Sequence, residues 1–349
     1  MKTPSAQLDS RKAYILATVV YEYIETAEPV GSNTLLQKYN LGVSSATIRN
    51  EMAELEASGY LVQPHTSAGR IPSDAGYRTY VDQLMQPEHL TASERRRIRD
   101  ELRDASHELG EMIASTSRLL SRFSKNFAFI IAPPAESHAF RHIQLIWLAP
   151  RTAVAIVMSS MGTASQNVFE LKSDVTPDDL TRLSNALNLH LNGKLLREIT
   201  DDDVSTAIDE LGLSTDVRAA VRSALRNARS SEAPSVSAAG AQNLLDQPEF
   251  HDLHKLRSIL RIVEEQRTLY DLVADSINRD EPTVKIGHEL ASDDIAECSI
   301  VTVPYHFGEH AIGLLAILGP RRMPYGRLMA LAAGTAVTLS EQLSDVELK

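Results

Sequence analysis

The sequence is poor in cysteine, in long apolar runs and in positive charge, and each shortage excludes a class of protein. One cysteine, Cys298, among 349 residues excludes an internal disulfide framework and any metal site built from several cysteines. No apolar run reaches the roughly 18 to 20 residues that span a bilayer, so we expect no membrane segment. The first apolar stretch is amphipathic and unlike a signal peptide, which indicates a cytoplasmic protein.

Motifs of the common enzyme classes are also missing. The sequence contains no glycine-rich loop of the phosphate-binding type and no Gly-x-Ser-x-Gly segment. We therefore expect a protein that is not an enzyme and that needs no cofactor or metal ion.

The shortage of positive charge bears on whether the protein could bind nucleic acid. The formal net charge is −11, and even residues 1–86 carry more carboxylates than cations. Bulk charge would therefore not attract DNA. Binding would require that a few cations converge on one side of the molecule, and the candidates are Arg49, Arg70, Lys38 and Lys12.

The first feature that the sequence does contain is helical periodicity near its start. Apolar residues spaced three and four apart predict a helix from Asp9 to about Thr26. Ser32 is expected to cap a short second helix, and Ser44 or Ser45 a third helix that ends at Gly59. These elements follow one another as in a helix-turn-helix.

A polar hairpin follows the third predicted helix. Two short extended segments, 60–64 and 70–72, flank the glycine-containing stretch 65–69. A fourth helix is expected to begin at Ser73 or Asp74. Residues 1–87 are therefore predicted to be a winged helix-turn-helix domain.

The third helix has the surface that a DNA-recognition helix needs. Its outer face is small and polar, and it can enter a major groove, where arginine pairs with guanine and asparagine with adenine. Hydroxyls at its start and donors on the hairpin suit phosphate oxygens. The alternative is a winged-helix fold used for protein contacts. The candidate DNA-binding residues are Ser44, Ser45, Ala46, Thr47, Arg49, Asn50, His65, Thr66, Ser67, Gly69 and Arg70.

The rest of the chain indicates an α+β multidomain protein. Residues 91–125 have heptad spacing and predict one long linking helix, either packed on its own domain or paired in a dimer coiled coil. A last helix is expected over 325–343. Strands are expected over 127–132, 143–148, 154–158 and 167–171, and again over 284–286, 299–305 and 311–318.

The two groups of strands are interpreted as parts of one sheet. That interpretation gives one α+β domain made of 126–176 and 247–349, with a mostly helical insertion over 177–246. The segment from Ser230 to Ala241 is rich in serine and alanine, and it is expected to be a flexible loop.

A specific pattern of residues covers much of the predicted winged helix and continues in three distant places. Its segments are 30–32, 34–35, 41–42, 45–52, 59–61, 63–72, 76–78 and 80–82, then 243–245 with 248–250, 286–287 with 289, and 319–320 with 322–323 and 325. In these residues, over nearly its whole length, the chain resembles the bacterial family of heat-inducible transcription repressors. Two positions depart from the family pattern. Asn33 stands where the family often has a basic residue, so we expect a phosphate contact there to be missing, and Pro324 stands where a polar residue is usual.

The resemblance implies a repressor of heat-shock chaperone operons that binds an inverted-repeat operator in double-stranded DNA as a homodimer. It also implies a GAF-like domain that carries an inserted dimerisation domain, and a chaperonin partner that keeps the repressor active. The rival interpretation is a ligand-gated regulator, because a GAF-like domain can hold a small molecule beside its sheet.

Overall fold

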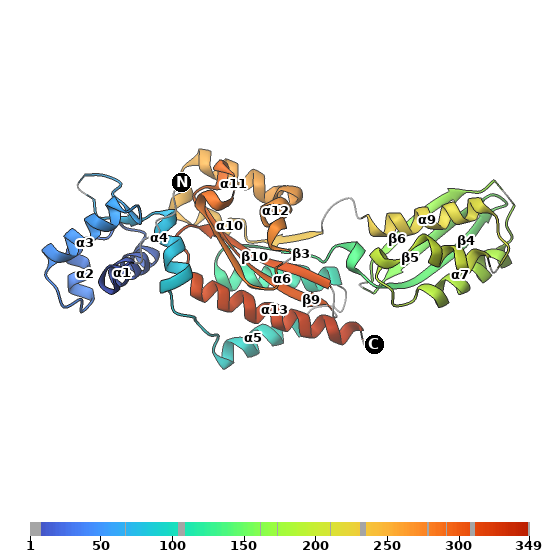
Figure 1. The fold of residues 1–349 in the computed structure, drawn as a ribbon, viewed down its shortest axis with the longest axis horizontal. Coiled ribbons are helices and arrows are strands. Elements are labelled where there is room, and N and C mark those ends of the chain that lie inside the picture. The colour runs from blue at the N-terminus through green and yellow to red at the C-terminus, as the bar shows by residue number, and fades with distance from the viewer. Residues whose placement is uncertain are drawn as a thin grey trace.

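The computed structural model describes residues 8–347, apart from 67, 104–108, 161, 173, 210, 231–234, 278, 291 and 308–310. The described chain forms an elongated molecule of three parts in a row (Figure 1). An N-terminal group of helices lies at one end, a five-stranded sheet with helices in the middle, and a three-stranded sheet with helices at the other end. Within this description no helix is both long and apolar enough to cross a bilayer.

The N-terminal part contains the predicted helices and hairpin. The Asp9 side chain caps the first helix, and the Ser44 side chain caps the third by accepting from Thr47 N at 3.2 Å. Ser32 does not cap the second helix, because it is the first helical residue and follows Gly31. The elements are α1 (Ser10–Thr26), α2 (Ser32–Lys38), α3 (Ser45–Ala57), β1 (Leu61–Val62) and β2 (Ile71–Pro72).

The prediction of one long linking helix over 91–125 is wrong. The chain forms α5 (Ala92–Arg103) and α6 (Leu109–Ser124). An ion pair joins Glu101 to Arg122, although a continuous helix would separate residues 21 apart by about 31 Å. The helix pair therefore folds back on itself.

The fold-back buries both apolar stripes in one core. Ile98 and Leu102 of α5 and Leu119 of α6 are all buried in the hydrophobic cluster that includes α13 (Tyr325–Glu347). The expected heptad spacing is thus satisfied by contacts within one chain, because any adjacent apolar surface can cover such a stripe.

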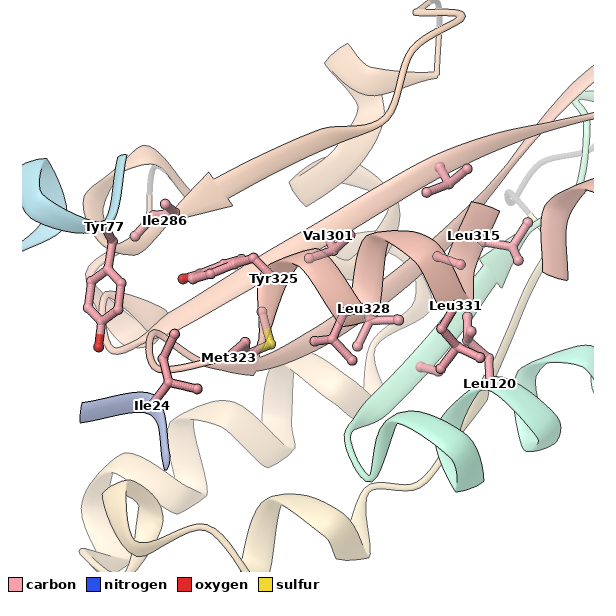
Figure 2. Close-up of a cluster of buried hydrophobic side chains, with 14 of the residues drawn as sticks. Ile24, Tyr77, Leu120, Ile286, Val301, Leu315, Met323, Tyr325, Leu328 and Leu331 are labelled. Carbon is pink, nitrogen blue, oxygen red and sulfur yellow. The ribbon is translucent and has the colours of Figure 1, made fainter. Parts of the chain in front are cut away.

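The middle part is an antiparallel sheet of five strands with helices on both faces. Its strand order is β7-β3-β10-β9-β8. Figure 2 shows Val301 and Leu315 of the sheet facing Leu328 and Leu331 of α13. The elements are β3 (Phe127–Ile131), β7 (Val236–Ala239), β8 (Thr283–Ile286), β9 (Cys298–Phe307), β10 (Ala311–Pro320), α10 (Gln242–Leu245), α11 (Leu253–Glu264) and α12 (Gln266–Val273).

The remaining strands form a separate sheet, so the expected single sheet is wrong. This sheet has the order β4-β5-β6 and is covered by helices on one face (Figure 1). Its hydrophobic core is its own, and Phe140, Leu183 and Leu225 lie within that core. The elements are β4 (Phe140–Ala149), β5 (Thr152–Ser159), β6 (Ala164–Glu170), α7 (Pro177–Leu191), α8 (Asp201–Asp209) and α9 (Thr215–Arg229).

The insertion therefore begins earlier than predicted and contains strands as well as helices. The predicted boundary between 126–176 and 177–246 divides this module, because β4, β5 and β6 pack against α7 and α9. We call residues 140–229 the inserted module.

The segment from Ser230 to Ala241 is not simply a loop. Residues 236–239 form β7, which pairs with β3 so that Ala238 lies opposite Phe129. Strand β7 is an edge strand of the five-stranded sheet, and β3 supplies its backbone hydrogen bonds.

The N-terminal part is joined to the sheet through α4 (Asp74–Thr79), which is followed by a π-helical turn, Tyr80–Leu84. Figure 2 shows Tyr77 beside Ile286 and Tyr325, and the two tyrosine rings meet edge to face with centroids 6.1 Å apart. The hydrophobic core of the helices is therefore continuous with one face of the sheet.

Candidate nucleic-acid interface

Helix α3 has one buried and one exposed face. Ile48, Met52 and Leu55 are fully or almost fully buried in the N-terminal core. Arg49 and Asn50 are exposed, as are the small residues Ala46 and Ala53. The structure therefore places the predicted recognition face in solvent.

Carboxylates pair with most of the cations of this part. Between residues 11 and 78, each described lysine and arginine except Arg49 forms an ion pair with a described carboxylate. The other five are each paired with a carboxylate, which offsets their charge. Those pairs are Arg11–Glu51 at 3.6 Å, Lys12–Glu54 at 2.8 Å, Lys38–Glu22 at 2.7 Å, Arg70–Glu56 at 2.9 Å and Arg78–Asp82 at 3.1 Å.

Arg70 and Gly69 lie at the base of the hairpin rather than at its tip. Arg70 Nε donates to Glu56, the arginine side chain is 15% exposed, and its backbone pairs with Val30. A Cβ atom at position 69 would lie 2.4 Å from Val30 O. Glycine is required there because two backbone segments approach closely.

The hairpin tip exposes His65 and Thr66. Ser67, the third predicted tip residue, lies outside the described residues. The sequence analysis missed Gln63, whose Nε2 donates to Thr66 O at 3.2 Å and to Ala68 O at 2.9 Å. These bonds fix the shape of the turn, and only the folded hairpin brings the amide to those carbonyls.

A second group of polar side chains joins α2 to the start of α3. Ser45 Oγ donates to Asn33 Oδ1 at 2.6 Å, and it lies 3.1 Å from Ser32 Oγ. Next to them, Ser44 Oγ and Thr47 Oγ1 are 3.0 Å apart. The sequence analysis indicated Ser44, Ser45 and Thr47 as phosphate donors, whereas at Asn33 the family resemblance led us to expect that a phosphate contact would be missing.

A buried carboxylate, Glu22 of α1, joins the first helix to the end of α2. The Glu22 side chain accepts from Lys38 Nζ at 2.7 Å and from the Tyr39 hydroxyl. Burial alone would raise the pKa of Glu22, but these two hydrogen bonds outweigh it and hold the pKa below its ordinary value. Lys38 is therefore held by this buried carboxylate, although its own side chain is 52% exposed.

The described residues offer little for a metal ion. No group of three or more histidine, cysteine, aspartate or glutamate side chains in the described chain is placed to hold one. An open cavity of about 470 Å³ lies on α11, in the middle part, and is lined by His254, Arg257, Ser258 and Arg261. It belongs to a different part of the molecule from α3.

Comparison with known proteins supports one family. Residues 110–329 match the family model of the HrcA protein C-terminal domain. The heat-inducible transcription repressor HrcA of Pelotomaculum thermopropionicum is 38% identical over 341 residues, covering 97% of this chain and 98% of that protein. The same repressor of Moorella thermoacetica is 37% identical over 342 residues, covering 97% and 99%.

A solved structure has the same fold. The crystal structure of a hypothetical protein aligns with a TM-score of 0.60 at 24% identity, covering 97% of this chain and 100% of that one. The α+β architecture and these relatives define the class of the protein as a transcription repressor. The chain belongs to the HrcA family of heat-inducible transcription repressors.

Proposed function

We propose that the chain represses heat-shock chaperone operons by binding double-stranded operator DNA through a winged helix-turn-helix. Helices α2 and α3 form the helix-turn-helix, and the β1–β2 hairpin is the wing. The observation that carries the proposal is Arg49, which lies next to Asn50 on the exposed face of α3 and pairs with no carboxylate among the described residues. Such a cation is available for a negatively charged partner.

In this proposal α3 lies in a major groove. The small side chains of Ala46 and Ala53 let the helix approach the base edges. Arg49 donates to O6 and N7 of guanine, and Asn50 forms the paired contact with adenine. Ser44 and Thr47 lie at the start of the helix, close to the phosphates on either side of the groove. Ser45 lies there too, but it donates its single hydrogen to Asn33 and takes part through that residue.

The hairpin extends the interface along the DNA backbone. His65 and Thr66 supply donors at its tip, and Gly69 permits its close contact with the rest of the domain. Ser67 is proposed as a further donor from its place in the sequence. Arg70, because Glu56 holds its guanidinium, supports the hairpin rather than entering a minor groove.

We also propose that two copies of the chain associate through the inserted module, which would be the dimerisation domain of the family. Helices cover one face of its sheet, and the other face exposes apolar side chains. Ile146 of β4 and Val168 of β6 are 39% and 60% exposed, and Val154 of β5, which pairs with both, is buried between them. An apolar sheet face that no described element of the same chain covers is suited to a second copy.

The dimer proposal has a matched test. Val168→Asp should reduce the dimer fraction measured by sedimentation velocity, because a charge would be buried in the interface. Val337→Asp is the control, since Val337 of α13 is also 60% exposed but lies outside the module. Equal association of both variants and the unmodified protein would refute this choice of surface.

Operator binding is tested with DNA from the promoter of the organism's own chaperonin operon. In a gel-shift assay we expect tight binding to that duplex and weak binding to a scrambled duplex of the same length. In a two-fold dimer the half-sites should lie about one helical turn, or a multiple of it, apart. Equal affinity for both duplexes would refute sequence-specific repression.

Activation by the chaperonin is proposed from the family alone. We expect the fraction of DNA-binding protein after refolding to rise when chaperonin is added, and equal fractions would contradict the proposal. The middle part is proposed to be GAF-like. A ligand-gated regulator would instead show a rise in melting temperature with a metabolite extract.

A further inference from the structure

A chain of hydrogen bonds runs from the interior of the N-terminal part to its surface. It begins at Ser32, a buried residue of α2, passes through Ser45 at the start of α3, and ends at the exposed side chain of Asn33. Because these three residues connect the two helices of the helix-turn-helix, their chemistry bears directly on the proposed DNA interface.

The direction of these hydrogen bonds follows from the number of hydrogens on each hydroxyl group. A serine hydroxyl has one hydrogen, and Ser45 donates it to Asn33 Oδ1 at 2.6 Å. In the 3.1 Å contact between the two hydroxyls, Ser32 is therefore the donor and Ser45 the acceptor. Linked donors polarise one another, so the Asn33 amide becomes a stronger hydrogen-bond donor at its nitrogen.

The amide nitrogen is the free end of this chain. Among the residues that the structure describes, none accepts a hydrogen bond from Asn33 Nδ2. The amide is held by Ser45, the first residue of α3, and a DNA backbone passes the start of such a helix when it occupies the major groove.

We infer that Asn33 binds a DNA phosphate through a neutral hydrogen bond, with Ser45 as the residue that positions its amide. This inference rests on the proposed DNA-binding function. The ligand is a phosphodiester oxygen, which accepts hydrogen bonds in every sequence. The contact therefore adds affinity without base preference and, because it carries no charge, without release of a counterion.

The salt dependence of binding separates this contact from an ionic one. Operator affinity is measured by fluorescence anisotropy across a series of salt concentrations. Asn33→Ala should weaken binding about tenfold, to operator and scrambled duplex alike, with an unchanged slope against salt. Asn33→Lys should steepen that slope by about 0.9, because a cation now meets the phosphate.

Two further variants test the positioning role and the specificity of the effect. Ser45→Ala should also weaken binding, but it should cause no further loss when combined with Asn33→Ala, because Ser45 acts through that amide. Asn40→Ala is the matched control. It removes the same side chain from an exposed position after the end of α2 and should bind as the unmodified protein does.

Each contrary result has a definite meaning. Unchanged affinity in Asn33→Ala, or a flatter salt slope in that variant, would overturn the neutral contact. Additive losses from Asn33→Ala and Ser45→Ala would overturn the positioning role. If the unmodified protein does not distinguish operator from scrambled DNA, the proposed function fails first. If it does, while Asn33→Ala binds normally, only this inference fails.

Discussion

Arg321 Nη1 donates to Asp74 Oδ1 at 2.7 Å, which joins two residues 247 positions apart in the chain. The same carboxylate lies 2.8 Å from His288 Nδ1, and Arg321 also donates to Glu297 at 2.5 Å. Asp74 begins α4, directly after the hairpin. This group of charges therefore connects the candidate nucleic-acid interface to the five-stranded sheet.

The first prediction concerns this connection. Asp74→Asn keeps the shape of the side chain but removes the charge that Arg321 pairs with. We expect the free energy of unfolding in urea to fall by about 1–3 kcal/mol, because partly buried donors lose a charged acceptor.

Asp174→Asn is the control for the loss of a carboxylate. Asp174 pairs with Arg151 at 3.0 Å, but both side chains are well exposed, so the substitution should change stability very little. If the two variants lose the same stability, the Asp74 pair is no stronger than an ordinary surface pair.

The second prediction concerns pH. Hydrogen bonds from Lys38 and Tyr39 lower the pKa of buried Glu22, so the folded state favours its ionised form. The resulting stability is fully present above the unfolded pKa of about 4.5 and is lost as the pH falls through the lower folded pKa. Urea unfolding should therefore become easier in that acidic range.

Glu22→Gln tests the assignment of that pH dependence. The variant should lose about 1–3 kcal/mol at neutral pH and should lose less additional stability on acidification than the unmodified protein. Glu25→Gln, an exposed carboxylate on the same helix, is the control and should leave both properties nearly unchanged. An identical acid profile in Glu22→Gln would contradict the assignment.

The third prediction concerns the base of the hairpin. Gly69→Ala would place a methyl group 2.4 Å from Val30 O, so the backbone must move. We expect a loss of about 1–3 kcal/mol in stability and weaker DNA binding. Gly110→Ala is the control, because an added Cβ at this helical position meets no atom within 4 Å. Normal stability in Gly69→Ala would show that the hairpin adjusts without cost.

The fourth prediction concerns the exposed face of α3. Arg49→Ala and Asn50→Ala should each cost about 1–3 kcal/mol in operator binding and should relax the preference for one base pair. Both residues are exposed, so the fold should be unaffected. Arg96→Ala removes an exposed cation from α5 and should leave the preference intact. Unchanged operator affinity in both α3 variants would remove this face from the interface.

The sequence alone determined most of the N-terminal part and its candidate site. Local signals define α1, α3 and the hairpin, since helix caps, apolar periodicity and glycine act over a few residues. The same periodicity predicted that Arg49 and Asn50 would face away from Ile48, and their exposure agrees. Family membership was also evident from the residues of this part.

Only the tertiary structure decided which distant segments meet. The apolar heptad stripe of 91–125 could be covered by a partner chain or by α13. In the structure it packs against α13, and the segment forms two helices, α5 and α6, that fold back on each other. Whether β4 joins β3 or starts another sheet depends on hydrogen bonds between segments far apart in sequence. The same is true of Arg70 and Asn33, whose partners Glu56 and Ser45 become neighbours only when the helices pack.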